Sequence, residues 1–233
     1  MCEKCKGFHY REGKGFLDES LKSFLERKTF LGALARRRRF RRLGKEYTDW
    51  EKNGAILPMP HLGKKRVVSE YALRFGLPFF IETGTYRGGM IYSMLNQFEE
   101  IFSIELDEAL FQKARQRFAG YDNVHLFYGQ SSDVLPKILQ QINRPCLFWL
   151  DAHWSGGDTA KGELETPIVD ELACILTHRC VMEHVLLIDD ARCFTGENDY
   201  PTLLTLKKVI HRFQPGWIFE VRDDIIRVHP PET

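Results

Sequence analysis

Short continuous apolar runs alternate along the chain with longer segments whose apolar residues recur every three or four positions. The apolar runs lie at residues 78–82, 100–105, 124–128, 146–150 and 185–188. Runs of this length with little polar alternation are typical of strands buried on both faces of a parallel sheet. Segments with helical spacing lie around and between them, at residues 64–75, 90–98, 108–118, 135–142, 166–176 and 200–213.

Two further strand-like segments end the chain. Residues 217–222 and 225–228 flank Asp223 and Asp224, a pattern that predicts a hairpin at one edge of the sheet. Strands that alternate with helices build a parallel sheet with helices on both faces. We therefore predict an α/β fold with a Rossmann-like, doubly wound sheet, mostly parallel and closed by an antiparallel C-terminal hairpin.

The N-terminal region differs from this regular pattern. Residues 16–42 have helical apolar spacing, and residues 53–63 are rich in glycine and proline, which favours a loop. We predict two parts: a basic helical extension or cap over residues 1–62, and the main domain over residues 63–233.

The composition is that of an ordinary globular protein. The chain has 233 residues, 43% hydrophobic and 28% charged, with a net charge of +1. So small a charge gives the whole molecule little attraction for nucleic acid or membrane. No apolar run approaches the roughly 18 residues needed to span a bilayer, and we find no secretory signal. Six cysteines without disulfide-like spacing fit a reducing compartment, so we predict a cytoplasmic protein.

The first strand runs directly into a glycine-rich turn. The segment reads Glu82-Thr83-Gly84-Thr85-Tyr86-Arg87-Gly88-Gly89. Its glycines allow a sharp turn and a close approach of the backbone to a ligand. The G-x-x-x-G spacing differs from the G-x-G-x-x-G of dinucleotide-binding folds. Glu82 would repel a pyrophosphate and attract a ligand that carries positive charge, so the turn favours a cationic ligand.

The next two strands end in residues suited to a nucleoside. Glu105 lies 21 residues beyond Gly84, where an acidic side chain can accept both ribose hydroxyls. The third strand is followed by Gln130, Ser131 and Ser132, which can hydrogen-bond an adenine edge. A plain turn that caps the next helix explains these three residues equally well.

Three carboxylates follow the fourth and fifth strands. Asp151 comes after the fourth strand, and Asp189 and Asp190 come after the fifth. We expect them to converge on one edge of the sheet, where like charges need a positive partner. Carboxylate oxygens suit Mg²⁺, which would bind a substrate hydroxyl and lower its pKa. In the simpler alternative, Asp189 or Asp190 only caps the segment that follows.

His153 is the candidate general base, because an unperturbed imidazole titrates near neutral pH. A structural hydrogen bond is the alternative role for its side chain. Residues 157–165 are polar and rich in glycine, and we expect them to cover the rim of the sheet as a lid or substrate loop.

These residues resemble the class I S-adenosylmethionine-dependent methyltransferases. Glu82-x-Gly84-x-x-x-Gly88 resembles the first motif of that family, and Glu105 matches its ribose-binding acid. The resemblance covers about residues 64–229. It implies a seven-stranded sheet with the last strand antiparallel, S-adenosylmethionine as cofactor, and in-line attack on the methyl group. It assigns cofactor contacts to Glu82, Thr83, Gly84, Thr85, Tyr86, Gly88, Glu105, Gln130, Ser131, Ser132 and Asp151.

Within that family, the later strand ends are similar to the metal-dependent O-methyltransferases of the catechol type. The similarity implies Asp151, Asp189 and Asp190 as ligands of Mg²⁺. From the residues themselves, we expect His153 and Asp151 to be the catalytic residues. Residues 85–89 (TYRGG) are also similar to the macrolide-sugar O-methyltransferases. The catechol enzymes place a lysine base shortly after the fourth-strand Asp, where this chain has His153, and their adenine turn differs. We therefore expect a small-molecule or sugar hydroxyl as acceptor rather than catechol.

Six of the seven residues from Arg36 to Arg42 are arginine, and the seventh is Phe40. This arginine cluster suits a peripheral contact with an anionic membrane, whereas a cap over the substrate site or an arm of a homodimer explains it more simply. A single aromatic residue within the cluster gives little reason to expect nucleic acid as a partner. Two other functions stay open: a metal-independent O- or N-methyltransferase with His153 as base, and a non-catalytic module with a basic membrane- or partner-binding arm.

Overall fold

The computed structural model describes residues 30–151 and 166–232. The chain divides into two compact units, Met1–Phe40 and Arg41–Thr233. The sheet and the helices that cover it all lie in the second unit.

Helix α2 (Phe30–Lys52) contains the arginine cluster. It accounts for the later part of the helix predicted over residues 16–42, whereas residues 16–29 lie outside the described residues. Arg41 and Arg42 are exposed on this helix. Within residues 30–151 and 166–232, no helix combines the length and the apolar character that crossing a bilayer requires.

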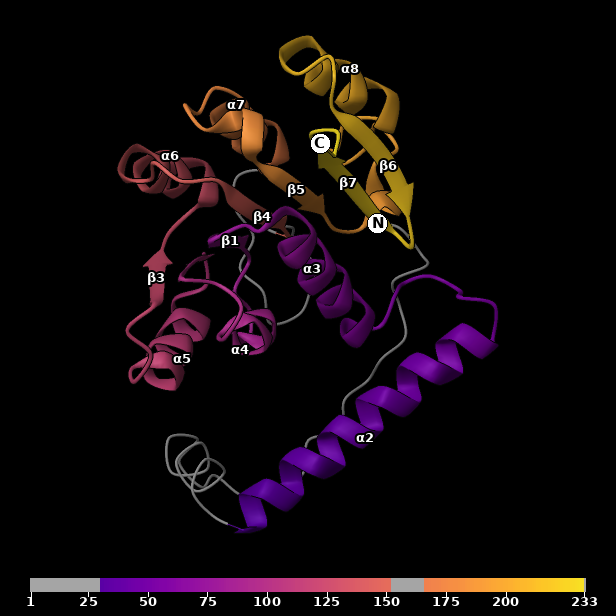
Figure 1. Cartoon of the computed structure of the whole chain (residues 1–233), viewed down its shortest axis with the longest axis vertical. Coiled ribbons are helices and arrows are strands. Elements are labelled where there is room, and N and C mark those ends of the chain that lie inside the picture. The colour runs from indigo at the N-terminus through magenta and orange to yellow at the C-terminus, as the bar shows by residue number, and fades with distance from the viewer. Residues whose placement is uncertain (1–29, 152–165, 233) are drawn as a thin grey trace. The chain divides into compact units, whose positions relative to one another are not determined.

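In the described part of the chain, seven strands form one sheet in the order β3-β2-β1-β4-β5-β7-β6 (Figure 1). The strands are β1 (Phe79–Thr83), β2 (Glu100–Glu105), β3 (Val124–Tyr128), β4 (Cys146–Leu150), β5 (Val185–Ile188), β6 (Ile218–Arg222) and β7 (Ile225–His229). Strands β1 to β5 are parallel, and β7 pairs antiparallel with both β5 and β6. The predicted α/β, doubly wound, seven-stranded sheet is confirmed.

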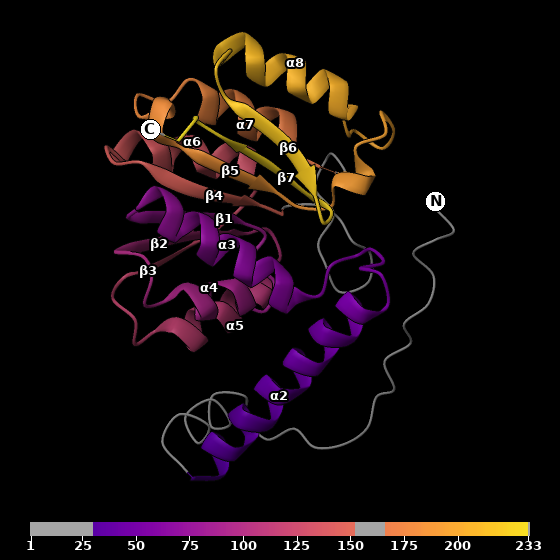
Figure 2. The same cartoon turned by 45° about the vertical axis from the view of Figure 1, so that its right-hand side comes forward.

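Helices cover both faces of this sheet (Figure 2). One face carries α3 (His61–Phe75), α4 (Gly89–Met94) and α5 (Glu108–Phe118). The other face carries α6 (Ser131–Gln141), α7 (Ile168–Leu176) and α8 (Leu203–Phe213). Neighbouring residues of β1 belong to different layers of the core: Phe80 packs toward the α3 face and Ile81 toward the α6 face. Because helices bury both faces, the strands are apolar without alternation.

Several helices begin or end a few residues away from the positions that periodicity predicts. Helix α6 begins at Ser131 rather than residue 135, so Ser131 and Ser132 lie in its first turn. Helix α8 begins at Leu203, where Thr202 Oγ1 accepts a hydrogen bond from the Thr205 N–H across 3.1 Å. Capping of this kind, rather than apolar spacing, decides where a helix begins.

Candidate functional site

Backbone hydrogen bonds hold the residues that follow β1, β4 and β5 side by side. The Asp151 N–H donates to the Thr83 carbonyl across 3.1 Å, and the Asp189 N–H donates to the Leu150 carbonyl across 3.0 Å. These residues form a rim along the carboxyl edge of the sheet, at the point where the strand order reverses between β1 and β4. Open α/β sheets bind their ligands at such a point.

The glycine-rich turn between β1 and α4 depends on Gly84 and Gly88. Their φ angles are 87° and 65°, in the left-handed region that side chains disfavour. A Cβ on Gly88 would lie 2.5 Å from Cε2 of Phe118, so space as well as conformation requires glycine there. Tyr86 has a φ of 47° without being glycine. A residue held in this region needs support from its surroundings.

Glu105 supplies that support from the end of β2. Its Oε2 accepts from the Tyr86 N–H across 2.7 Å, and its Oε1 accepts from the Asp107 N–H across 2.9 Å. Burial raises the pKa of Glu105, and these backbone donors oppose the rise. Each carboxylate oxygen can accept more than one hydrogen bond, so Glu105 can hold the turn and also accept from a ligand hydroxyl.

Glu82 lies beneath the turn and is only 2% exposed. Its Oε2 accepts from Ser103 Oγ across 2.7 Å, and the Ser103 and Thr85 hydroxyls are 2.6 Å apart. Burial raises the pKa of Glu82 to about 8. A cation bound beside it would favour the carboxylate form. Sequence reasoning missed Ser103, although a lone serine inside a buried apolar strand is a detectable signal.

A second buried acid, Glu171, lies on α7 with 1% exposure. Burial raises its pKa to about 7, and the nearby Ser131 and Thr83 hydroxyls oppose the rise. One oxygen of Glu171 and both hydroxyls are buried and do not reach the geometry of a full hydrogen bond. Ser131, predicted to contact adenine, therefore lies buried next to an acid that sequence reasoning missed.

The structure brings the three predicted metal ligands together. Carboxylate oxygens of Asp151, Asp189 and Asp190 lie within 4.8 Å of one another. Asp189 and Asp190 are buried, with 4% and 5% exposure. Crowded acids of this kind need a positive neighbour, as the sequence analysis argued.

Lys64, on the first turn of α3, is such a neighbour. Its Nζ donates a hydrogen bond to Asp189 Oδ2 and lies 3.7 Å from Asp190 Oδ1. Burial by itself would lower the pKa of Lys64, but the carboxylates of Asp189, Asp190 and Asp151 outweigh it and raise the pKa.

Burial and Asp151 raise the pKa of Asp189, and the Lys64 ammonium opposes this rise. The hydrogen bond between the two groups favours a Lys64 ammonium paired with an Asp189 carboxylate. The proton therefore stays on Lys64, in agreement with its raised pKa.

Arg192 supplies a second positive charge. Its Nη1 donates to Asp190 Oδ1 across 2.7 Å and also pairs with Asp224. The Ala191 N–H donates to the Asp224 carbonyl across 2.8 Å, which ties the residues after β5 to the β6–β7 hairpin. Asp190 itself has a φ of 54°, and these contacts hold it in that conformation.

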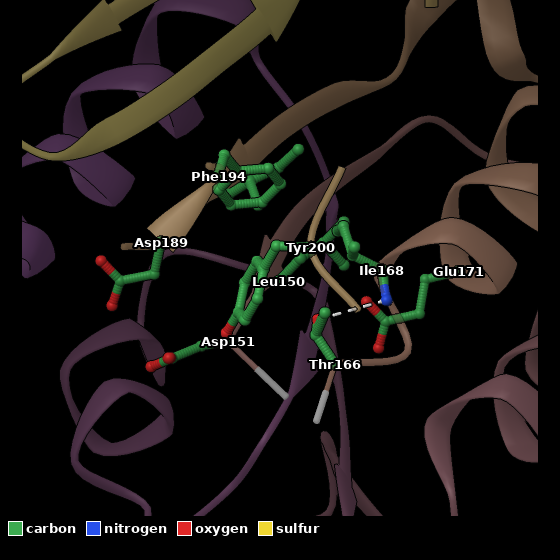
Figure 3. Close-up of a pocket in the computed structure, with 9 residues that line it drawn as sticks. Leu150, Asp151, Thr166, Ile168, Glu171, Asp189, Phe194 and Tyr200 are labelled. Carbon is green, nitrogen blue, oxygen red and sulfur yellow. Dashed lines mark hydrogen bonds between the residues drawn. The ribbon is translucent and has the colours of Figure 1, made fainter. Parts of the chain in front are cut away.

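A pocket opens beside the acidic cluster, between the ends of β4 and β5 and the start of α7. Figure 3 shows Asp151 and Asp189 at one end of the group and Glu171 at the other, with the ring of Tyr200 between them. The lining residues are Leu150, Asp151, Thr166, Ile168, Glu171, Ile188, Asp189, Phe194 and Tyr200. The pocket therefore combines aromatic walls with acids at both ends.

His153, the predicted base, lies outside the described residues, as do residues 154–165. A different imidazole lies near the rim. His61 is the first residue of α3 and is exposed at the surface. Partial desolvation and the Lys64 ammonium lower its pKa, and Asp151 opposes this shift. Sequence reasoning placed residue 61 in a loop and so did not consider it.

The fold places the chain in the class of α/β proteins with a Rossmann-like, seven-stranded sheet. Among solved structures, it is similar to the SAH-bound methyltransferase PaMTH1 of Podospora anserina, with 16% identity and a TM-score of 0.52 over 96% of this chain and 100% of that chain. It is also similar to the O-methyltransferase TomG of Streptomyces achromogenes, which is involved in tomaymycin synthesis and was solved with SAM. That likeness has 15% identity and a TM-score of 0.51 over 81% of this chain and 89% of that chain.

A weaker likeness is to the 23S rRNA methyltransferase ErmE, with 13% identity and a TM-score of 0.46 over 72% of this chain and 68% of that chain. No protein-family model and no curated protein matches the chain. At these identities the likeness is one of fold and does not identify an acceptor.

Proposed function

We propose that the protein is an S-adenosylmethionine-dependent methyltransferase. The observation that carries the proposal is the glycine-rich turn at the strand-order reversal, held by Glu105 and underlain by the buried acid Glu82. The fold shared with a SAH-bound and a SAM-bound structure supports it.

In this proposal the cofactor lies over the carboxyl ends of β1, β2 and β3. Glu105 binds the ribose, the turn between Gly84 and Gly88 approaches the amino acid part, and Glu82 provides negative potential beneath it. The proposed contacts also include Thr83, Thr85, Tyr86, Gln130, Ser131, Ser132 and Asp151. When bound, the cofactor would supply a sulfonium methyl group for transfer to the acceptor.

The acceptor in this proposal is a hydroxyl of a small molecule or sugar, bound at the pocket beside Asp151 and Asp189. The pocket adjoins the rim from the β4 and β5 side, and aromatic rings of Phe194 and Tyr200 line it. A membrane contact of the arginine cluster and a homodimer stay predictions.

The arrangement of the acidic cluster does not fit the predicted Mg²⁺. Asp151, Asp189 and Asp190 are the oxygen ligands that would hold it. In the structure, however, Lys64 donates to Asp189 Oδ2, an oxygen that the ion would need. We therefore propose methyl transfer without a step that depends on the metal, with His153 as the candidate base.

Calorimetric titration of the full chain with S-adenosylhomocysteine tests the cofactor part. We expect saturable binding and a rise in melting temperature. Absence of both heat and stabilisation at millimolar ligand would exclude the proposal. Binding without turnover on any hydroxylated acceptor would instead favour the non-catalytic module.

A further inference from the structure

We propose that the Lys64 ammonium is the resident cation of the Asp151–Asp189–Asp190 cluster, and that it occupies the position in which a divalent metal would bind. The bearing of this proposal on catalysis rests on the proposed function, but the occupancy of the cluster does not. The proposal predicts that the Asp151–Asp189–Asp190 cluster of this protein binds no divalent ion.

The first support is the way in which α3 presents Lys64. The buried stripe of this helix contains Lys64, Val67, Val68, Tyr71 and Ala72, which follow helical spacing. The apolar members of the stripe belong to the core layer that also holds Trp149 of β4 and Leu187 of β5. The helix therefore lies against the two strands that carry the acids, and Lys64 continues its buried face to their ends.

The start of α3 is tightly packed. A Cβ added to Gly63 would lie 2.6 Å from Met59 Cγ and 2.8 Å from Tyr47 Cε2. Lys64 is only 9% exposed. A buried lysine in so closely packed a turn is held in place, unlike a solvated surface lysine that samples many rotamers.

The second support is that both oxygens of Asp189 and one oxygen of Asp190 already have donors. Asp189 accepts from Lys64 at Oδ2 and from the Asp190 N–H at Oδ1, across 2.9 Å. Asp190 Oδ1 accepts from Arg192. A protein-bound Mg²⁺ sits about 2.0–2.1 Å from its oxygen ligands, so an ion at Asp189 Oδ2 would compete with the Lys64 ammonium for the lone pair that Lys64 now occupies.

The third support is charge. Lys64 pairs with Asp189 and Asp190, and Arg192 pairs with Asp190 as well as with Asp224. A divalent ion at the same oxygens would lie within contact distance of an ammonium of like charge in a buried site, where screening is weak. The ammonium and the metal therefore exclude each other.

The experiment is Mn²⁺ binding by the full chain, followed by electron paramagnetic resonance of the free ion. The proteins are the wild type, Lys64→Met, Asp189→Asn, the double variant Lys64→Met/Asp189→Asn, and Lys65→Met as a control on the next residue of the same helix. Binding of S-adenosylhomocysteine is measured on each protein in parallel and reports on the proposed function separately.

We expect no stoichiometric Mn²⁺ binding by the wild type or by Lys65→Met, and an unchanged melting temperature of the wild type in EDTA. Lys64→Met should gain one Mn²⁺ site, and the added Asp189→Asn should remove it. One Mn²⁺ bound by the wild type and lost on Asp189→Asn would overturn the proposal, and this result does not depend on whether Lys64→Met folds. A folded Lys64→Met that gains no Mn²⁺ site would also overturn it.

Discussion

The Tyr86 backbone N–H donates to Glu105 Oε2 across 2.7 Å and so fastens the glycine-rich turn to the end of β2. The turn is the proposed site of the cofactor's amino acid part, and Glu105 is the proposed ribose ligand. One carboxylate therefore both shapes the turn and faces the place where the ribose is expected.

Glu105→Gln is expected to weaken binding of S-adenosylhomocysteine by at least about tenfold, or ~1.4 kcal/mol, because a neutral amide accepts less strongly from N–H and hydroxyl donors. Calorimetry measures the change. Glu100→Gln, at the other end of the same strand, is the control and should leave the affinity unchanged. Equal affinities of the two variants would remove Glu105 from the site.

Gly88→Ala is expected to lower the free energy of unfolding by about 1–3 kcal/mol, because alanine is strained at a φ of 65°. Contact with the Phe118 ring adds to this cost. Gly120→Ala is the matched control: nothing lies within 4 Å of its added Cβ, and its stability should change by less than about 0.5 kcal/mol. Urea unfolding measures the free energy of unfolding of both variants, and Gly88→Ala should be clearly less stable than Gly120→Ala.

Glu82→Gln should change how stability depends on pH. Burial raises the pKa of Glu82 from its ordinary value of 4.5 to about 8 in the folded chain, so the folded state holds this proton more tightly. The wild type therefore loses stability as pH rises from about 4.5 through 8.

Glu82→Gln lacks this proton, so its stability relative to the wild type should improve across the same pH range, by an amount on the order of a few kcal/mol. Urea unfolding at several pH values measures it, with the exposed Glu70→Gln as control. A difference between Glu82→Gln and wild type that does not vary with pH would contradict the buried proton.

Lys64 and Asp189 should be strongly coupled in stability. Lys64→Met leaves a buried carboxylate without its cation and is expected to cost roughly 3–5 kcal/mol. In Lys64→Met/Asp189→Asn the unpaired charge is gone, so the double variant should be clearly more stable than the sum of the two single changes implies. A double-mutant cycle by urea unfolding measures this coupling, and strict additivity would show that the pair contributes nothing.

The strands and their order along the chain could be predicted from the sequence alone. Residues 100–105, 124–128, 146–150 and 185–188 were predicted as strands, and the structure has strands at those same positions. Burial on both faces leaves a continuous apolar run, which is a local signal. The C-terminal hairpin was equally local: Asp223 and Asp224 both have positive φ, which short acidic residues tolerate in a tight turn.

The sequence also predicted which acids share one rim, because the carboxyl ends of parallel strands share an edge. Asp151, Asp189 and Asp190 were predicted to converge, and they do. The sequence left open which cation neutralises these three acids. The chemistry of carboxylates alone suggests Mg²⁺.

Only the tertiary structure could supply Lys64, which lies 125 residues before Asp189 in the chain. Periodicity shows a lysine on the buried stripe of α3 but not which strands that stripe covers. The same holds for Ser103 beneath Glu82 and for Glu171 beside Ser131. Apolar patterns are set by whether a residue is buried, whereas the partner of a buried charge is set by which elements pack together, and packing brings together residues that the sequence keeps far apart.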